Sequence, residues 1–461
     1  MRRHLVLFAL GAAAVGFARD ARAQGFQVNE HGTCAMARGG AGVAKPCADG
    51  SGMFYNPAGL IGRNGWTVSA GITVIQAGGG FTDDLTANTT DLTNSAIPVP
   101  HLFVQYAKDK YAAGLGVFVP YGLGTNWPQT FDGAFAGYDN ALRNIYVQPT
   151  ASFRPHPKVT LGAGFDFVLG HVKLTQLVDL SENVVPNPLL PPGTTFGQLG
   201  VPPLTPFANG ELVGNGTGIG GHFGVVVEPV SRVRLGARYM TAVKVDYDGE
   251  VDFEPYPTGI TLTSGNPFGV PAGTALDDVV AGAFVVGPLL DQGGGASITL
   301  PDQLTAGVAF DLTSALTVMV DYSWVHWALF DTLQVNFDDA SLSGTTIENY
   351  ENTHGVRVGL DWAATPKAAV RAGYIYHTGA APAAVVTPLL PEGDRNEFTI
   401  GFGYAVSARF RFDAAYQYLK QQDRRGRTGE FPSGVVPDLT LNNGLYAFNA
   451  HLFGLTLTAG F

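Results

Sequence analysis

Apolar side chains alternate with polar or small ones over most of this chain. In residues 451–461, HLFGLTLTAGF, the apolar residues stand on every second position up to Phe461, with glycine or threonine between them. The same alternation occurs in residues 354–362 and 396–406. Because successive side chains of a strand point to opposite faces, a period of two predicts strands with one apolar face.

Fourteen such strands are predicted, and the gaps between them alternate in length. Six gaps are short and polar, and seven are longer, the longest spanning about 180–215 and 250–295. An even number of strands joined alternately by short turns and long loops is typical of outer-membrane barrels. The predicted centres are Gly71, Val104, Gly116, Pro149, Phe165, Gly224, Ala237, Gly307, Tyr322, Val358, Ala372, Gly401, Tyr416 and Leu455, and the short gaps are 108–110, 154–158, 228–232, 311–315, 364–367 and 406–408.

The expected fold is therefore all-β, a 14-stranded antiparallel transmembrane β-barrel. A sheet that faces lipid must close on itself, since an open edge would leave backbone groups unsatisfied in hydrocarbon. The alternative is a soluble two-sheet secreted protein, but its connections would not sort regularly into short and long. The terminal Phe461 resembles the ending by which outer-membrane barrels are presented to their assembly machinery.

The N-terminal residues indicate the cell compartment, and the net charge excludes one class of partner. Basic residues at 2–4, an apolar run at 5–17 and Ala-Arg-Ala at 21–23 form a secretory signal peptide, residues 1–23. The expected location is the outer membrane of a Gram-negative cell. A net charge of −11 excludes a nucleic-acid partner, which would need clustered Lys and Arg.

Residues 24–63 precede the first strand and are rich in glycine and alanine. A 14-stranded barrel (residues 64–461) is too wide for its own side chains to fill. We therefore predict that residues 24–63 form a plug, or hatch, inside the lumen; a disordered periplasmic tail is the alternative. Cys34 and Cys47 lie in this exported segment, where a disulfide is favoured over free thiols. Two cysteines are too few for a cysteine-only metal site.

Several motifs in this chain resemble a known family. GFQVNEHG, MARGGAGVA and CADGSGMFYNPAGL (residues 25–32, 36–44 and 47–60), with later pieces at 114–128, 233–249 and 300–337, are similar to FadL/TodX-type outer-membrane transporters of long-chain fatty acids and hydrocarbons. The resemblance implies an external groove that catches an apolar substrate and a pocket in the lumen. It also implies lateral release through a kinked third strand, beside the Asn-Pro-Ala of the hatch.

Candidate residues follow for each of these parts. Asn56, Pro57 and Ala58 carry the hatch motif, and Gly114, Gly116 and Pro120 are residue types that weaken a strand ladder. An uncharged loop at 187–210 is the candidate groove, because exposed apolar residues signal binding. Its candidate residues are Leu189, Leu190, Phe196, Leu199, Leu204 and Phe207, and the head-group candidates, taken as lumen-facing, are Arg357, Arg371, Lys173 and Lys244. These cations could instead form structural ion pairs with Asp361 or Asp321.

The sequence thus predicts passive uptake of hydrophobic compounds, with long-chain fatty acids as the first choice of substrate. Alkanes and monoaromatic hydrocarbons are alternatives within this class; a non-selective porin, a barrel enzyme and an adhesin are alternatives outside it. A G-x-G-x-x-G match at 216–221 leads into a strand, whereas a dinucleotide site needs a helix there. We therefore expect no enzyme activity, no cofactor and no metal. The expected partners are the substrate, membrane lipid and lipopolysaccharide, and the expected state is a monomer.

Overall fold

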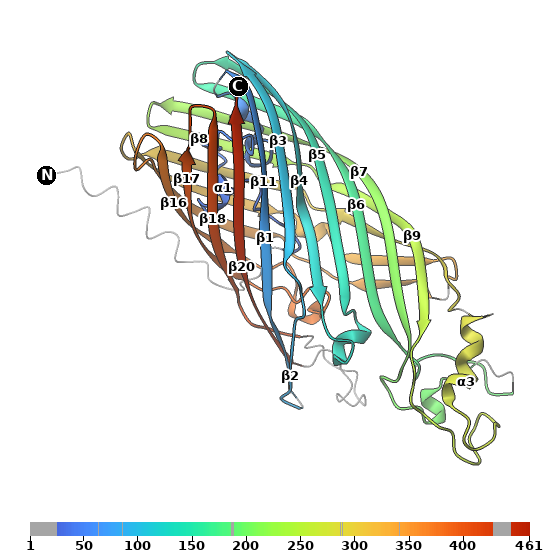
Figure 1. The fold of residues 1–461 in the computed structure, drawn as a ribbon. Helices are drawn as coiled ribbons and strands as arrows, with labels where there is room; N and C mark the ends of the chain where they lie inside the picture. Colours follow the sequence, from blue (N-terminus) through green and yellow to red (C-terminus); the bar gives the residue numbers. More distant parts are fainter. Residues whose placement is uncertain are drawn as a thin grey trace.

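The chain folds into one closed antiparallel sheet (Figure 1). The structure is a computed structural model that describes residues 25–426, apart from 63, 85, 186–188, 286, 288 and 341, and residues 444–461. The predicted signal peptide at 1–23 lies outside the described residues. The last strand pairs with the first, which closes the ring as a membrane barrel requires.

The wall consists of fourteen strands over the described residues, and all fourteen predicted centres lie within them. Five of the strands are interrupted or extended, so that two elements share one place in the ring. In order they are β1 (Gly65–Asp83), β3 (Ile97–Lys108), β4 (Tyr111–Asn126), β5 (Asp139–His156), β6 (Val159–Asp179), β7 (Pro206–Val230), β8 with β9 (Val233–Met240, Val243–Pro255), β10 with β11 (Gln292–Leu300, Gln303–Asp311), β12 with β13 (Leu316–Val325, Thr332–Phe337), β14 and β15 (Gly344–Ile347, Thr353–Trp362), β16 (Ala368–His377), β17 (Arg395–Ala405), β18 and β19 (Phe410–Gln421, Arg424–Arg425) and β20 (Gly444–Gly460). A short strand, β2 (Thr89–Asp91), pairs with β1 in the first long connection. The predicted fold class is confirmed.

The helices are short. Three lie before the first strand: α1 (Thr33–Met36), α2 (Gly52–Tyr55) and the 3-10 helix η1 (Pro57–Leu60). The others lie in the connections: η2 (Asp132–Phe135), η3 (Gly197–Leu199), α3 (Leu276–Val280), η4 (Ala281–Phe284), η5 (Trp327–Leu329) and η6 (Ala383–Val385). Within the described residues, none of these helices is long and apolar enough to cross a membrane. The long connections, with α3, gather at the end of the barrel opposite the C-terminus (Figure 1).

Alternation places apolar side chains outside and polar ones inside. Phe398 and Ile400 of β17 are 56% and 58% exposed, whereas Glu397 and Thr399 between them are buried. A water-soluble protein would bury the apolar set. Here the outer face meets hydrocarbon, so the apolar side chains of β17 belong outside and its polar side chains face the lumen.

Residues 25–62, here called the N-terminal segment, lie inside the barrel (blue in Figure 1). Its 3-10 helix η1 lies against β5, β6 and β7, and α1 lies against β17, β18 and β20. Glycines on the wall make room for it. A Cβ on Gly162 would overlap the backbone of Pro57 and Ala58, and a Cβ on Gly224 would lie 2.7 Å from Pro57 Cδ. The wall and the segment are therefore complementary in shape.

Charged groups attach the N-terminal segment to β11, β12 and β15, which lie between these two sets of strands. Arg38 Nη1 lies 3.4 Å from Asp361 Oδ2, and Lys45 Nζ lies 3.1 Å from Asp311 Oδ1. The buried carboxylate of Asp321 accepts hydrogen bonds from the backbone N–H groups of residues 42 and 43, at 2.7 and 2.9 Å. A disulfide joins Cys34 to Cys47 within the segment.

Candidate functional site

Strand β4, the third of the barrel, is irregular near its middle. Its ladder with β3 runs from Lys108↔Tyr111 to Leu102↔Val117 and then stops. Its ladder with β5 shifts register between Phe118 and Tyr121 and then continues toward Asn126. Pro120, which has no N–H to donate, lies in this shift. The extracellular half of β4 therefore leaves β3.

The N-terminal segment occupies the backbone edge that β4 exposes there. Val28 N donates to Pro120 O at 2.9 Å, and Gly122 N donates to Phe26 O at 2.9 Å. Residues 26–28 thus behave as a short strand added to β4, at the place where the pairing of β4 with β3 has ended. The buried edge of β4 is satisfied by the N-terminal segment instead of by the wall.

The kink prediction fits Pro120 but was wrong for the two glycines. Gly114 pairs with Gln105 and Gly116 with Phe103, both in the regular part of the ladder. A Cβ on Gly114 would overlap the methyl group of Met53. Both positions require glycine because the N-terminal segment packs against them, and not because the strand bends there.

Asn56 connects the N-terminal segment to two strands. Its Nδ2 donates to Val225 O of β7 at 3.0 Å and to Ala237 O of β8 at 3.3 Å. Its Oδ1 accepts from Ala58 N at 3.0 Å, which caps η1. Ser152 of β5 donates to Pro57 O. The Asn-Pro-Ala motif is thereby fixed against β5, β7 and β8.

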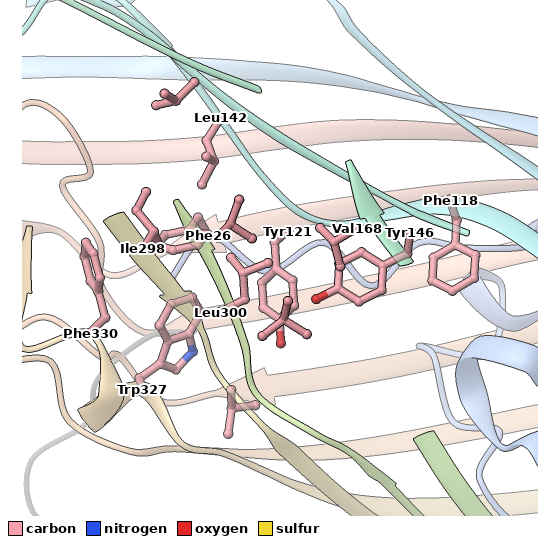
Figure 2. Packing of buried hydrophobic residues seen from close by; sticks show 14 of the residues in the cluster. Phe26, Phe118, Tyr121, Leu142, Tyr146, Val168, Ile298, Leu300, Trp327 and Phe330 are labelled. Atoms are coloured by element: carbon pink, nitrogen blue, oxygen red, sulfur yellow. The ribbon is translucent and has the colours of Figure 1, made fainter. Parts of the chain in front are cut away.

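Aromatic rings form a continuous file along the lumen (Figure 2). The ring centroids of Trp327 and Phe26 are 4.7 Å apart, and those of Phe26 and Tyr121 are 6.3 Å apart. Tyr146 follows at 6.0 Å from Tyr121, and Phe118 at 6.4 Å from Tyr146. The file leads from the end with the long connections to the irregularity in β4.

Two cavities flank this file. One of about 200 Å³ lies between residues 25–30 and strands β1, β17, β18 and β20; its charged lining residues are Glu30, Arg395 and Glu397. The other, of about 40 Å³, is lined mainly by apolar residues of the wall and the connections, and Glu348 is its one charged lining residue among those described. The space present is small, so a long substrate requires side chains or the N-terminal segment to move.

Glu348, in the connection between β14 and β15, gives a testable pH dependence. Burial raises the pKa of its carboxyl from 4.5 to about 8. Since the folded state holds the proton more tightly, its contribution to stability is complete below pH 4.5 and is lost as the pH rises to 8, by up to about 5 kcal/mol. Glu348→Gln should therefore raise the melting temperature at pH 9 and leave it unchanged at pH 4. Glu250→Gln, at an exposed position, is the control; equal effects of the two changes would refute the assignment.

The external connections form an apolar cluster of their own. Described residues between 180 and 208 pack against described residues between 262 and 289, and a cavity of about 270 Å³ lies among them. Of the predicted groove residues, Phe196 and Phe207 line this cavity. Leu190 and Leu199 support the cluster from its edge. The other lining comes largely from α3, η4 and their neighbours, which sequence reasoning missed although residues 279–290, VVAGAFVVGPLL, form an uncharged apolar run.

Leu189 and Leu204 do not line this cavity. Leu189 is 90% exposed. Leu204 is half-buried, with a left-handed φ of 57° in the connection that leads into β7. The loop bends between these residues and the cluster, so apolar composition alone did not separate lining from non-lining positions.

The predicted head-group cations have different environments. Arg371 is held by Asp361 at 3.2 Å and Asp413 at 2.7 Å, which is the structural ion pairing that the sequence left open. Arg357 is buried and donates to Asn29 of the N-terminal segment at 3.1 Å. Both side chains face the lumen, but Arg371 is already neutralised.

The prediction that Lys173 and Lys244 face the lumen was wrong. Val172 and Leu174, the neighbours of Lys173, line the 40 Å³ cavity, so Lys173 is on the outer face and pairs with Asp139 and Glu211. Lys244 stands between buried residues of β9 and is itself mostly exposed beside Asp246. The single-residue register of these strands was misassigned.

Arg238 of β8 is a lumenal cation that sequence reasoning missed. It is buried, its guanidinium lies 4.5 Å from the ring of Phe54, and it donates to Gln303 at 3.5 Å and to Met240 Sδ at 3.3 Å. Its Nε has no hydrogen-bond partner, and it makes no ion pair with a carboxylate of the described residues. Alternation in residues 233–240 was the signal that could have found it.

The family model for outer membrane protein transport proteins (OMPP1/FadL/TodX) matches residues 14–461. The chain belongs to this family. Members of this family are outer-membrane transport channels and not enzymes, and the location is the outer membrane. The FadL/TodX resemblance seen in the sequence is therefore confirmed.

Individual relatives agree over almost their whole length. The chain is 22% identical to the long-chain fatty acid transport protein of Escherichia coli O6:H1, over 92% of each chain. It superposes on a Pseudomonas aeruginosa FadL homologue with a TM-score of 0.76, at 20% identity, covering 95% of this chain and 100% of the other. For the Pseudomonas putida toluene transporter TodX the TM-score is 0.66, at 18% identity, covering 96% and 99%. These structures share the fold, and this FadL/TodX-family member transports hydrophobic compounds.

Proposed function

We propose that this FadL/TodX-family protein takes up long-chain fatty acids by passive diffusion, with the N-terminal segment as its hatch. The substrate is caught between the external connections, passes along the aromatic file and leaves sideways where β4 departs from β3. The observation that carries this proposal is that the file includes Tyr121 and ends at Phe118, the two residues that bound the register shift.

The distribution of charge supports a sideways exit. Toward the short turns, the lumen holds the ion pairs of Arg38 with Asp361 and Lys45 with Asp311, together with a polar cavity of about 430 Å³. An acyl chain would lose about 0.8 kcal/mol per methylene on entering such surroundings. Exit into the bilayer through the β3–β4 gap keeps the chain in apolar surroundings throughout.

Arg238 is the cation we assign to the carboxylate of the substrate. It lies beside the file, because Gln303, to which it donates, itself donates to the hydroxyl of Tyr121 at 2.6 Å. A buried guanidinium with an unused N–H and no carboxylate partner gains a charge-assisted hydrogen bond from a fatty acid. A hydrocarbon has no acceptor for this N–H group.

The test is uptake of labelled oleate by cells that lack their own transporter. Wild-type protein should restore uptake, and Arg238→Met should lower it about tenfold or more, the loss expected for a hydrogen bond to a charged group. Toluene uptake should be unchanged. Arg425→Met, which removes an exposed cation from an external connection, is the matched control.

A double change, Asn56→Ala with Pro57→Ala, tests the exit. It should abolish oleate uptake in a protein that still reaches the outer membrane. If Arg238→Met leaves oleate uptake intact, the head-group assignment is wrong. If the wild type carries no oleate at all, fatty acids are not the cargo.

Monoaromatic hydrocarbons are the second candidate. The file consists of aromatic rings, and Glu348 is the one charged lining residue of the smaller cavity, where a carboxylate substrate would meet an acid instead of a base. Toluene uptake that exceeds oleate uptake, and that is insensitive to Arg238→Met, would favour this candidate.

A further inference from the structure

The outer face of the barrel carries a groove that the transport path does not use. It has a volume of about 780 Å³ and is almost entirely apolar. It crosses β3 to β7 close to the short turns. A volume of this size falls within the range of ligand pockets, about 300–1,000 Å³.

The ladder registers explain the groove. Ala113 pairs with Ala151, and Ala151 pairs with Ala163, so three small outward side chains stand side by side on β4, β5 and β6. Tyr106 on β3 pairs with Ala113, and Phe223 on β7 pairs with Ala163. The trough therefore has an alanine floor and an aromatic residue at each end. With strands about 4.8 Å apart, the row of three alanines spans about 10 Å across the sheet, so an acyl chain can lie along it.

The edge of the groove nearest the short turns carries aromatic side chains, and basic side chains follow beyond them. Tyr111 and Phe153 stack at 5.0 Å and form the wall of the trough on that side. Lys108 lines the groove, and Lys110 follows in the same exposed turn. The turns 108–110 and 154–158 hold four cations and one acid, whereas the other four short turns hold two of each. An anionic group is favoured at this rim, although the protein as a whole carries −11.

We propose that this groove binds an anionic phospholipid of the periplasmic leaflet. An acyl chain lies on Ala113, Ala151 and Ala163, and the phosphate is met by Lys108 and Lys110. The site is formed by side chains of the outer face, separate from the lumen and from the cargo path. Behind it, Ser152 and the two glycines at 162 and 224 hold the Asn-Pro-Ala motif, so the bound lipid and the motif are separated by one layer of backbone.

The test is native mass spectrometry of the delipidated full-length protein titrated with phosphatidylglycerol. One phosphatidylglycerol should be retained by the wild type. Ala151→Leu with Ala163→Leu fills the trough and should remove it. Lys108→Gln with Lys110→Gln should weaken phosphatidylglycerol by about five-fold for each lysine, and phosphatidylethanolamine much less.

Ala372→Leu, on the outer face of β16 far from the groove, is the matched control and should retain the lipid. Equal occupancy in the filled variant, or equal loss in the control, would overturn the proposal. Displacement of phosphatidylglycerol by equimolar oleate would also overturn it, since the groove would then belong to the cargo. These readouts do not depend on uptake, so they separate this site from the proposed function.

Discussion

Barrels that carry Arg38→Met and Lys45→Met are expected to conduct small ions in planar bilayers, whereas the wild type is expected to stay closed. The two cations attach the N-terminal segment to Asp361 and Asp311. Removing the buried Arg38 guanidinium leaves Asp361 paired with Arg371, so the expected loss is that of one hydrogen bond between charged groups, about 1.5–3 kcal/mol. The half-exposed Lys45 pair adds less, about 0–1 kcal/mol. With both gone, the segment should leave its place often enough to open the lumen.

Single-channel recording measures this effect directly. Lys420→Met is the control, because its pair with Asp423 is exposed and does not involve the N-terminal segment. A double variant that stays as closed as the wild type would show that the disulfide and the Asn56 contacts hold the segment by themselves.

The second large effect is expected from Gly162→Ala. The added Cβ would overlap the backbone of Pro57 and Ala58, which cannot rotate away as a side chain would. Overpacking of this kind costs about 1–3 kcal/mol. Displacement of η1 also breaks the bonds from Asn56 to β7 and β8. Hydrogen exchange at residues 56–61 should therefore rise strongly, and oleate uptake should fall.

Gly78→Ala on β1 is the matched control, since its Cβ would meet nothing closer than 3.8 Å. It should leave hydrogen exchange in residues 56–61 unchanged. If hydrogen exchange at residues 56–61 is unchanged in Gly162→Ala, then β6 moves to accommodate the added Cβ and the Asn-Pro-Ala motif stays in place. The close fit between the wall and the N-terminal segment would then have no consequence for transport.

The sequence predicted the wall well because the signal is local. Every predicted strand centre, from Gly71 to Leu455, lies in a strand, since alternation is repeated in each segment and set by the lipid outside. Pro120 lies in the register shift of β4 for a related reason: a proline has the same effect on any ladder.

Contacts across the lumen were not predictable in this way. Gly114 and Gly116 looked like breaks in a ladder, yet they accommodate Met53, whose position depends on how the N-terminal segment folds back. An error of one residue in the predicted register placed Lys173 and Lys244 in the lumen, whereas both side chains are on the outer face. Arg238 became prominent only when its neighbours on other strands, Gln303 and Phe54, were known.

The closure of the ring by its first and last strands bears on how this protein is made. The ladder between β1 and β20 runs from Thr67↔Gly460 to Asp83↔Gly444. Residues 25–62, which precede β1, are therefore enclosed by a wall whose seam is formed by its first and last strands. Thr33 N bonds to Thr456 Oγ1, 423 positions away. The N-terminal segment must therefore dock before the seam closes. A barrel that closed first would be an open pore in the outer membrane.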